Sequence, residues 1–127
     1  MPKYDAANFN PPAPVAYVIL RNPATGASLS NVPMLMDTGA DVTLLPNQYL
    51  DELGIEAAED QVYEVQGFDG ESKFSKMVQL ELIFLGRKFA GQFWVIDQPA
   101  GILGRNILNS VSILFDGPRT KWDEYKK

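Results

Sequence analysis

The sequence contains no cysteine and no histidine among its 127 residues. These absences exclude thiol nucleophiles, histidine-based catalytic triads, haem ligation by either residue type and the usual zinc ligand sets. Any hydrolytic chemistry must therefore use carboxylate, hydroxyl or lysine side chains. We expect neither a metal ion nor an organic cofactor.

Basic residues are outnumbered by acidic ones, with 11 lysines and arginines against 16 aspartates and glutamates and a formal net charge of -5. No cluster of lysine and arginine forms a stripe that could follow a phosphate backbone, so nucleic acid is not an expected partner. The hydrophobic share of 46% and the charged share of 21% are ordinary for a globular protein. A chain of this length fits one domain.

Long hydrophobic runs are also missing. The N-terminus lacks a charged segment followed by a long apolar run, and the apolar segments elsewhere are only as long as strands. We therefore expect no membrane association, and the simplest location is cytoplasmic. The lack of cysteine agrees only weakly with this, because secreted proteins can also do without disulfides.

The chain divides into three parts by composition. Residues 1–14 are proline-rich and are expected to form a flexible N-terminal arm. Residues 15–117 carry the periodic apolar pattern of one folded domain. Residues 118–127 form a C-terminal tail that would either add a strand or stay loose.

The folded part is predicted to be mainly β. A hairpin is predicted at residues 15–21 and 27–36, which are rich in β-branched and apolar residues. The segment between them contains a proline and a glycine that suit a turn, and the second strand leads directly into Asp37. Polar and apolar residues alternate on both sides of a Gly-Phe-Asp-Gly tip, which predicts a second, longer hairpin. The two arms of this hairpin are residues 61–66 and 71–86. Further strands are expected at residues 88–97 and 111–117, and short helices at residues 46–54 and 104–110.

The segment MLMDTGADVTLLP, from Met34 to Pro46, places two carboxylates inside an apolar stretch. An Asx turn, with Gly39 supplying a positive φ, would use the same residue types without any chemistry, and the three letters DTG alone favour that interpretation. The apolar residues on both sides favour a different one, because they would place Asp37 at the base of a depression. A carboxylate in such a place needs a partner.

The segment VPMLMDTGADVTLLP, followed about sixty residues later by GILGRNILN, resembles the retropepsin-like aspartic proteases, which are single-domain relatives of pepsin. The ending ILFDGPR is similar to bacterial members. The resemblance covers residues 15–117. It implies a mainly β, closed, barrel-like fold with a flap hairpin and one or two short helices.

The resemblance also implies roles for the Asp-Thr-Gly residues. Asp37 would be the catalytic aspartate. The Thr38 hydroxyl would lock two active-site loops together, and Gly39 would offer a backbone contact to the substrate.

The next two residues, Ala40 and Asp41, would continue the substrate-facing loop. Asp41 would bind the substrate backbone and pair with Arg105 of the GRN motif. The same two charges could equally form an ordinary structural ion pair, and the two roles are compatible.

The resemblance places a flap tip and a set of substrate pockets. The tip would consist of Gly67, Phe68, Asp69 and Gly70, where glycines allow the hairpin to bend over a peptide or simply make a tight turn. Five further residues would line pockets, although each could equally be core: Leu35, Val42, Pro99, Ala100 and Ile102.

Peptide hydrolysis without metal, cysteine or histidine needs one carboxylate to activate water and a second acid to protonate the carbonyl oxygen. The chain has one Asp-Thr-Gly and presents GILGRN in the second corresponding place. The expected partners are therefore a second copy, giving a homodimer with one Asp37 from each chain, and a peptide or protein substrate. Residues 111–117 are the expected dimer strand.

Two other functions remain open from the sequence. A dimeric peptide-binding module could keep the same fold and cleft with little or no turnover. A purely structural dimerisation domain is less favoured, because it would not need an acid in the middle of an apolar loop.

Overall fold

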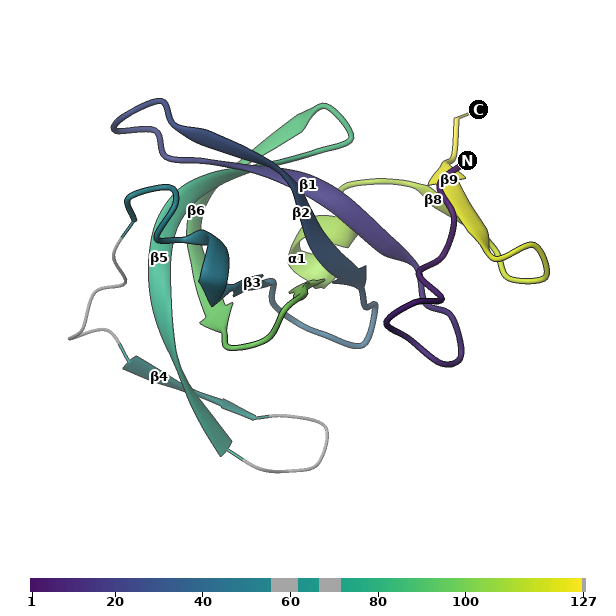
Figure 1. The fold of residues 1–127 in the computed structure, drawn as a ribbon, viewed down its shortest axis with the longest axis horizontal. Helices are drawn as coiled ribbons and strands as arrows, with labels where there is room; N and C mark the ends of the chain where they lie inside the picture. Colours follow the sequence, from purple (N-terminus) through teal and green to yellow (C-terminus); the bar gives the residue numbers. More distant parts are fainter. Residues whose placement is uncertain (56–61, 67–71, 127) are drawn as a thin grey trace.

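The computed structural model describes residues 1–55, 62–66 and 72–126. Within these ranges the chain is mostly β-strand, with one short α-helix and one short 3-10 helix (Figure 1). The strands are β1 (Val15–Arg21), β2 (Ser28–Met36), β3 (Leu44–Pro46), β4 (Val62–Gln66), β5 (Ser72–Phe84), β6 (Arg87–Ile96), β7 (Gly101–Leu103), β8 (Ile113–Asp116) and β9 (Lys121–Glu124). The helices are η1 (Asn47–Tyr49) and α1 (Arg105–Leu108).

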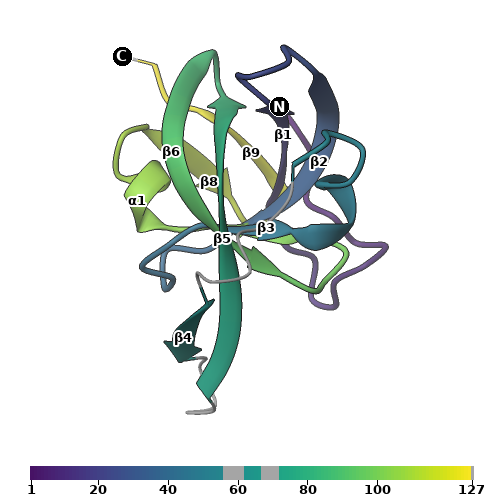
Figure 2. The same ribbon diagram turned by 90° about the vertical axis from the view of Figure 1, so that its left-hand side faces the viewer.

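Six of the strands close into a barrel. Their hydrogen-bonded order is β1-β2-β7-β3-β6-β5, and β1 also pairs with β5, so that the sheet returns to its starting strand. The long strand β5 runs out of the barrel and carries β4 as an extra antiparallel partner, which gives a projecting hairpin (Figures 1 and 2). The mainly β, closed, barrel-like fold that the sequence predicted is confirmed.

The barrel core follows from the alternation of side chains along each strand. In β1, Val18 and Leu20 are buried while Tyr17 is 59% exposed, because successive side chains point to opposite faces. Alternate residues of β2 and β5 are buried in the same way, and Leu108 of α1 joins the same apolar cluster. Burial of these side chains supplies the main driving force for closing the sheet.

Strand β7 lies between β2 and β3, and a glycine makes this arrangement feasible. A Cβ added to Gly101 would lie 2.5 Å from the Met34 sulfur and 2.7 Å from Cδ of Pro46. The parallel pairing of β2 with β7 then sets Leu35 beside Ile102 and Met36 beside Leu103. This register brings the end of β2 next to the start of α1.

The local predictions have mixed outcomes. The first hairpin is present as β1 and β2, and α1 lies inside the helix predicted at residues 104–110. The helix predicted at residues 46–54 is wrong in type, since only the 3-10 helix η1 forms there, followed by turns. No side chain caps its first turn, and Gly54 ends the segment at a φ of 66°.

The terminal segments pack together outside the barrel sheet. Strands β8 and β9 form a two-stranded sheet, so the C-terminal tail adds a strand. The Trp122 backbone N–H donates to the Pro2 carbonyl oxygen at 2.9 Å, and its indole N–H donates to the Val15 carbonyl oxygen at 3.3 Å. Trp122 is 5% exposed and belongs to the core, while the flexibility expected of residues 1–14 stays a prediction.

No helix within the described part of the chain is both long and apolar enough to span a bilayer.

Candidate active site

The candidate active site is the loop that follows β2 and begins at Asp37. Its backbone N–H donates to the Leu103 carbonyl oxygen at 3.0 Å, which continues the pairing of β2 with β7 by one residue. One Asp37 carboxylate oxygen, Oδ1, accepts a hydrogen bond from the Gly39 N–H at 2.8 Å, and the Ala40 N–H donates to the Asp37 carbonyl oxygen at 3.2 Å. The aspartate is therefore held by local backbone bonds, which is the Asx turn that its residue types favoured.

The same carboxylate is only half-buried in the single chain, and Thr38 and Gly39 next to it are exposed. The sequence placed Asp37 at the base of a depression, which the single chain does not provide in full. The loop turns away from the core after Met36, so its tip has no covering element among the described residues. One Asp37 oxygen is fixed by Gly39, and the other is left for a ligand or a second acid.

The start of α1 ties the loop to the barrel. The Arg105 backbone N–H donates to the Ala40 carbonyl oxygen at 2.8 Å, and its guanidinium Nη1 donates to the Thr38 carbonyl oxygen at 2.7 Å. Arg105 also forms an ion pair with Asp41 through Nη2. A single arginine thus holds three residues of the loop.

The ion pair predicted between Asp41 and Arg105 is present, and it lies at the surface. The Asp41 side chain is 82% exposed and that of Arg105 is 42% exposed. Exposed pairs of this kind contribute about 0–1 kcal/mol, so the pair matters more for the orientation of the loop than for stability. The guanidinium plane, with two contacts to the loop, fixes the direction in which Asp41 points.

A buried hydroxyl forms a second tie, which the sequence did not reveal. Thr43 is 1% exposed, and its Oγ1 donates to Oδ1 of Asn106 at 2.7 Å and accepts from the Gly104 N–H at 3.1 Å. The hydroxyl therefore bridges the end of the loop and the start of α1. A threonine next to an apolar strand gives no local signal of this role, because its partners lie more than sixty residues away.

The expected pocket residues lie on β2, in the loop after Asp37, and on or just before β7. Leu35 and Ile102 are direct neighbours across β2 and β7, and Ile102 also faces Leu44 of β3. Leu35, Ala40, Val42, Ala100 and Ile102 are half-buried, whereas Pro99 is exposed. Half-burial beside the loop leaves apolar surface for a ligand, but it is equally the environment of core-edge residues. The expected flap tip, residues 67–70, lies outside the described residues.

Within the ranges that the structure describes, no group of three acidic side chains lies close enough together to hold a metal ion. The polar groups that the site does present are the Asp37 carboxylate with one free oxygen, the Asp41 carboxylate paired with Arg105, the Thr38 hydroxyl and the backbone of Gly39. This set can activate a water molecule but supplies only one of the two acids that metal-free peptide hydrolysis needs.

Comparison with known proteins gives a consistent result. No curated protein matches this sequence, but 150 chains of solved structures match the fold. One is the structure titled "EIAV protease complexed with the inhibitor HBY-793", which is 23% identical, with a TM-score of 0.61 over 84% of this chain and 91% of that chain. At this identity the match shows a shared fold. The sequence model of the aspartyl protease family matches residues 24–107, which is more than half of the chain and includes both Asp37 and Arg105. The chain therefore belongs to the aspartyl protease family.

Proposed function

We propose that the protein is an aspartic endopeptidase that acts as a homodimer, with Asp37 of each copy facing the other across a two-fold axis. The observation that carries the proposal is the geometry of Asp37, which is half-buried at the start of an exposed loop and is fixed by the Gly39 N–H on one oxygen. Membership of the aspartyl protease family supports the chemistry. In each chain the Asp41 carboxylate of this loop is paired with Arg105, which leaves Asp37 as the one carboxylate for the reaction, and the chemistry needs two.

The proposed reaction uses one shared proton. Two carboxyl groups about 3 Å apart cannot both stay charged, so one is protonated and the other is not. The charged carboxylate takes a proton from a water molecule, whose oxygen attacks the peptide carbonyl carbon while the other carboxyl protonates the carbonyl oxygen. The tetrahedral intermediate then collapses and the C–N bond breaks: the carboxyl that took the water's proton gives it to the leaving nitrogen, and the other carboxylate takes back the hydroxyl proton as the carbonyl reforms.

The rest of the loop would position the two chains and the substrate. The exposed Thr38 hydroxyl is available to bond to the loop of the second copy, and the exposed Gly39 backbone is available to a peptide. Asp41, aimed by Arg105, would accept a hydrogen bond from a substrate backbone N–H. An extended peptide suits these groups, because its backbone donors and acceptors are unpaired.

The half-buried apolar residues beside the loop would select apolar side chains around the cleaved bond. Leu35 lies near the end of β2 just before the loop, Val42 lies in the loop itself, and Ile102 pairs with Leu35 across β2 and β7. The residues expected at the flap tip would cover the bound peptide.

The test is cleavage of an unstructured protein by the wild-type chain and by Asp37→Asn. The amide is nearly isosteric with the carboxylate and can still accept the Gly39 hydrogen bond, so we expect a folded protein with cleavage reduced by at least about 1,000-fold. Cleavage by the purified variant at the wild-type rate would refute the assignment. Binding of a peptide by the wild type without turnover would instead favour a peptide-binding module.

A further inference from the structure

Five half-buried apolar side chains form a continuous row across five strands of the barrel. The row crosses β2, β7, β3, β6 and β5, and its members pair directly with one another in the order Leu35, Ile102, Leu44, Trp94 and Met77. Residues directly opposite each other on neighbouring strands point to the same face of a sheet. We call these five residues the apolar row.

The apolar row lies on the outer face of the barrel. The neighbours of its members along each strand, such as Met34, Leu45 and Phe93, are buried in the core, and successive side chains of a strand point to opposite faces. Among the described residues, neither the core cluster nor the half-buried side chains packed against it include any member of the row. The row is therefore apolar surface that the barrel does not use for its own core.

One end of the apolar row adjoins the candidate catalytic carboxylate. Asp37 lies two residues after Leu35 and extends the pairing of β2 with β7 by one residue. Alternate residues of a strand share a face and are about 6.6 Å apart, so Asp37 and Leu35 lie on the same outer face. Neighbouring strands are about 4.8 Å apart, which places Trp94, three strands from Leu35, about 14 Å away. About four residues of an extended peptide span that distance.

Trp94 is the bulkiest member of the row and lies between Leu44 and Met77. Side chains directly opposite each other on neighbouring strands have Cβ atoms about 4.5–5.5 Å apart, so these two neighbours border the indole on both sides. An indole occupies more of the space above the sheet than the leucine and isoleucine that precede it in the row. Less room is therefore left for a ligand at Trp94 than at Leu35 and Ile102.

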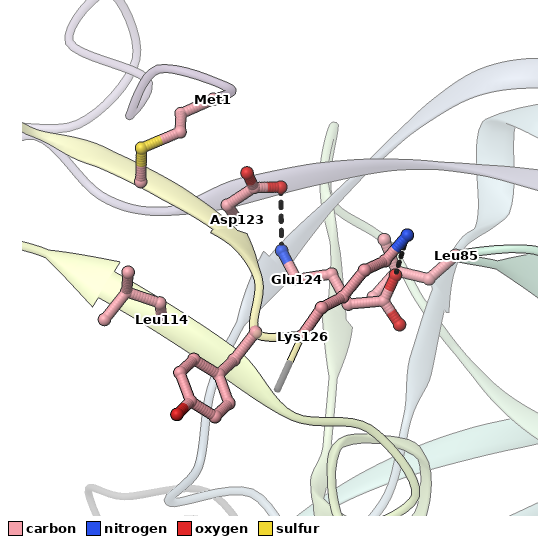
Figure 3. Close-up of a pocket in the computed structure, with 7 residues that line it drawn as sticks. Met1, Leu85, Leu114, Asp123, Glu124 and Lys126 are labelled. Carbon is pink, nitrogen blue, oxygen red and sulfur yellow. Dashed lines mark hydrogen bonds and ion pairs between the residues drawn. The ribbon is translucent and has the colours of Figure 1, made fainter.

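The terminal sheet offers a different kind of surface. An open depression of about 460 Å³ lies there (Figure 3), lined by Met1, Leu85, Leu114 and residues 123–126. Three of its side chains are charged, and Lys126 pairs with Glu124 at 3.9 Å. None of these lining residues belongs to the loop after Asp37 or to the strands of the row. The apolar row, and not this depression, adjoins the carboxylate.

We propose that the substrate peptide lies along the apolar row and that Trp94 sets the size of the side chain that binds at its far end. The inference rests on the proposed function and deepens it, because it assigns a preference at a position removed from the cleaved bond. A side chain next to the bond rests on Leu35 and Ile102. The side chain that reaches Trp94 is small, because the indole occupies the space that a bulky one would need.

The test is a cleavage-site profile on a complex peptide mixture for the wild type, Trp94→Ala and Tyr17→Ala. Tyr17 is the matched control, since it is an aromatic residue that is 59% exposed on β1, outside the row. We expect the wild type to favour alanine over phenylalanine at one position within about four residues of the cleaved bond. Trp94→Ala should raise kcat/KM for phenylalanine relative to alanine there by at least about 10-fold, with the preferences next to the bond unchanged. The Tyr17→Ala profile should equal that of the wild type.

Binding is measured separately from turnover, in the Asp37→Asn background. The chain has two tryptophans, and Trp122 is only 5% exposed, so a bound peptide should change the fluorescence of Trp94. The change should be absent after Trp94→Phe.

The outcomes separate this inference from the proposed function. If the wild type cleaves but Trp94→Ala has the wild-type profile, the role of Trp94 is wrong and the proposed function stands. If Asp37→Asn binds peptides with the expected preference and fluorescence change but the wild type never cleaves, the row is supported and the proposed function fails. If Trp94→Ala does not fold, the binding series decides, and equal affinity for alanine and phenylalanine at every position would overturn the inference.

Discussion

Replacement of Gly104 by alanine should disturb the catalytic loop through a steric contact. A Cβ at this position would lie 2.5 Å from the Val42 carbonyl carbon and 3.0 Å from the Ala40 carbonyl oxygen, and closer still to the Val42 carbonyl oxygen. All three atoms belong to the backbone of the loop that follows Asp37. Because Cβ atoms are not found within 3.0 Å of such atoms, the loop and α1 must separate by at least about 0.5 Å.

The separation acts on the bonds that hold the loop. The Arg105 N–H to Ala40 bond of 2.8 Å and the Gly104 N–H to Thr43 bond of 3.1 Å both cross this contact. The φ of Gly104 is -92°, which any residue adopts, so the effect would come from the contact alone. Overpacking of this kind costs about 1–3 kcal/mol. A shift approaching 1 Å at the reacting group lowers kcat/KM by about 10- to 100-fold.

The assay compares Gly104→Ala with Gly117→Ala. Gly117 has no atom within 4 Å of an added Cβ and no positive φ, so its replacement should leave both the urea midpoint and the cleavage rate unchanged. We expect Gly104→Ala to lower the midpoint and to reduce kcat/KM for a flexible peptide. A Gly104→Ala protein with the wild-type midpoint and the wild-type kcat/KM would refute the close packing of α1 on the loop.

Two other predictions concern stability. Thr43→Val removes the buried hydroxyl but keeps the shape of the side chain, so Asn106 and the Gly104 N–H each lose a hydrogen bond and the free energy of unfolding should fall by about 1–3 kcal/mol. Thr43→Ser keeps a hydroxyl and should lose less. Equal urea midpoints for the wild type and both variants would contradict the bridge. Glu81 has a pKa below its ordinary 4.5, chiefly because the Arg21 guanidinium donates to it at 2.5 Å and also because Lys88 lies 3.2 Å away. Because the pKa of Glu81 is lower in the folded state, its stabilising effect is present above pH 4.5 and is lost as the pH falls through the folded-state pKa. Glu81→Gln should therefore make the free energy of unfolding less dependent on pH on the acid side. An unchanged slope of that free energy against pH below 4.5 would contradict this.

The elements that the sequence predicted correctly are those with a local signal. The alternation of apolar residues marks β1, β2, β5 and β6, because each of these strands has one face toward the barrel core. The sequence did not decide whether the tail would form a strand, because KWDE, the segment of β9, contains only one apolar residue and so has no alternation. Its position depends on the pairing with β8 and on the burial of Trp122 against segments more than a hundred residues earlier in the chain.

The candidate site shows the same division. Asp37 and its Asx turn follow from four consecutive residues, and the ion pair of Asp41 with Arg105 follows from the resemblance to a family with paired motifs. Gly104 and Thr43 were missed, because their roles come from the distance between two loops and not from either loop alone. A glycine before an arginine and a threonine before two leucines are each unremarkable in sequence.

The proposed dyad makes activity depend on protein concentration, because each chain supplies one Asp37 and the second must come from a partner copy. The specific activity of the wild type should therefore fall on dilution as dimers dissociate, whereas a self-sufficient monomer would show no such loss. Sedimentation and a peptide-cleavage assay over the same range of protein concentrations measure both quantities together. We expect the fraction of dimer and the specific activity to fall in parallel. Full activity from a species that sediments as a monomer would refute the shared dyad, and with it the role proposed for Asp37.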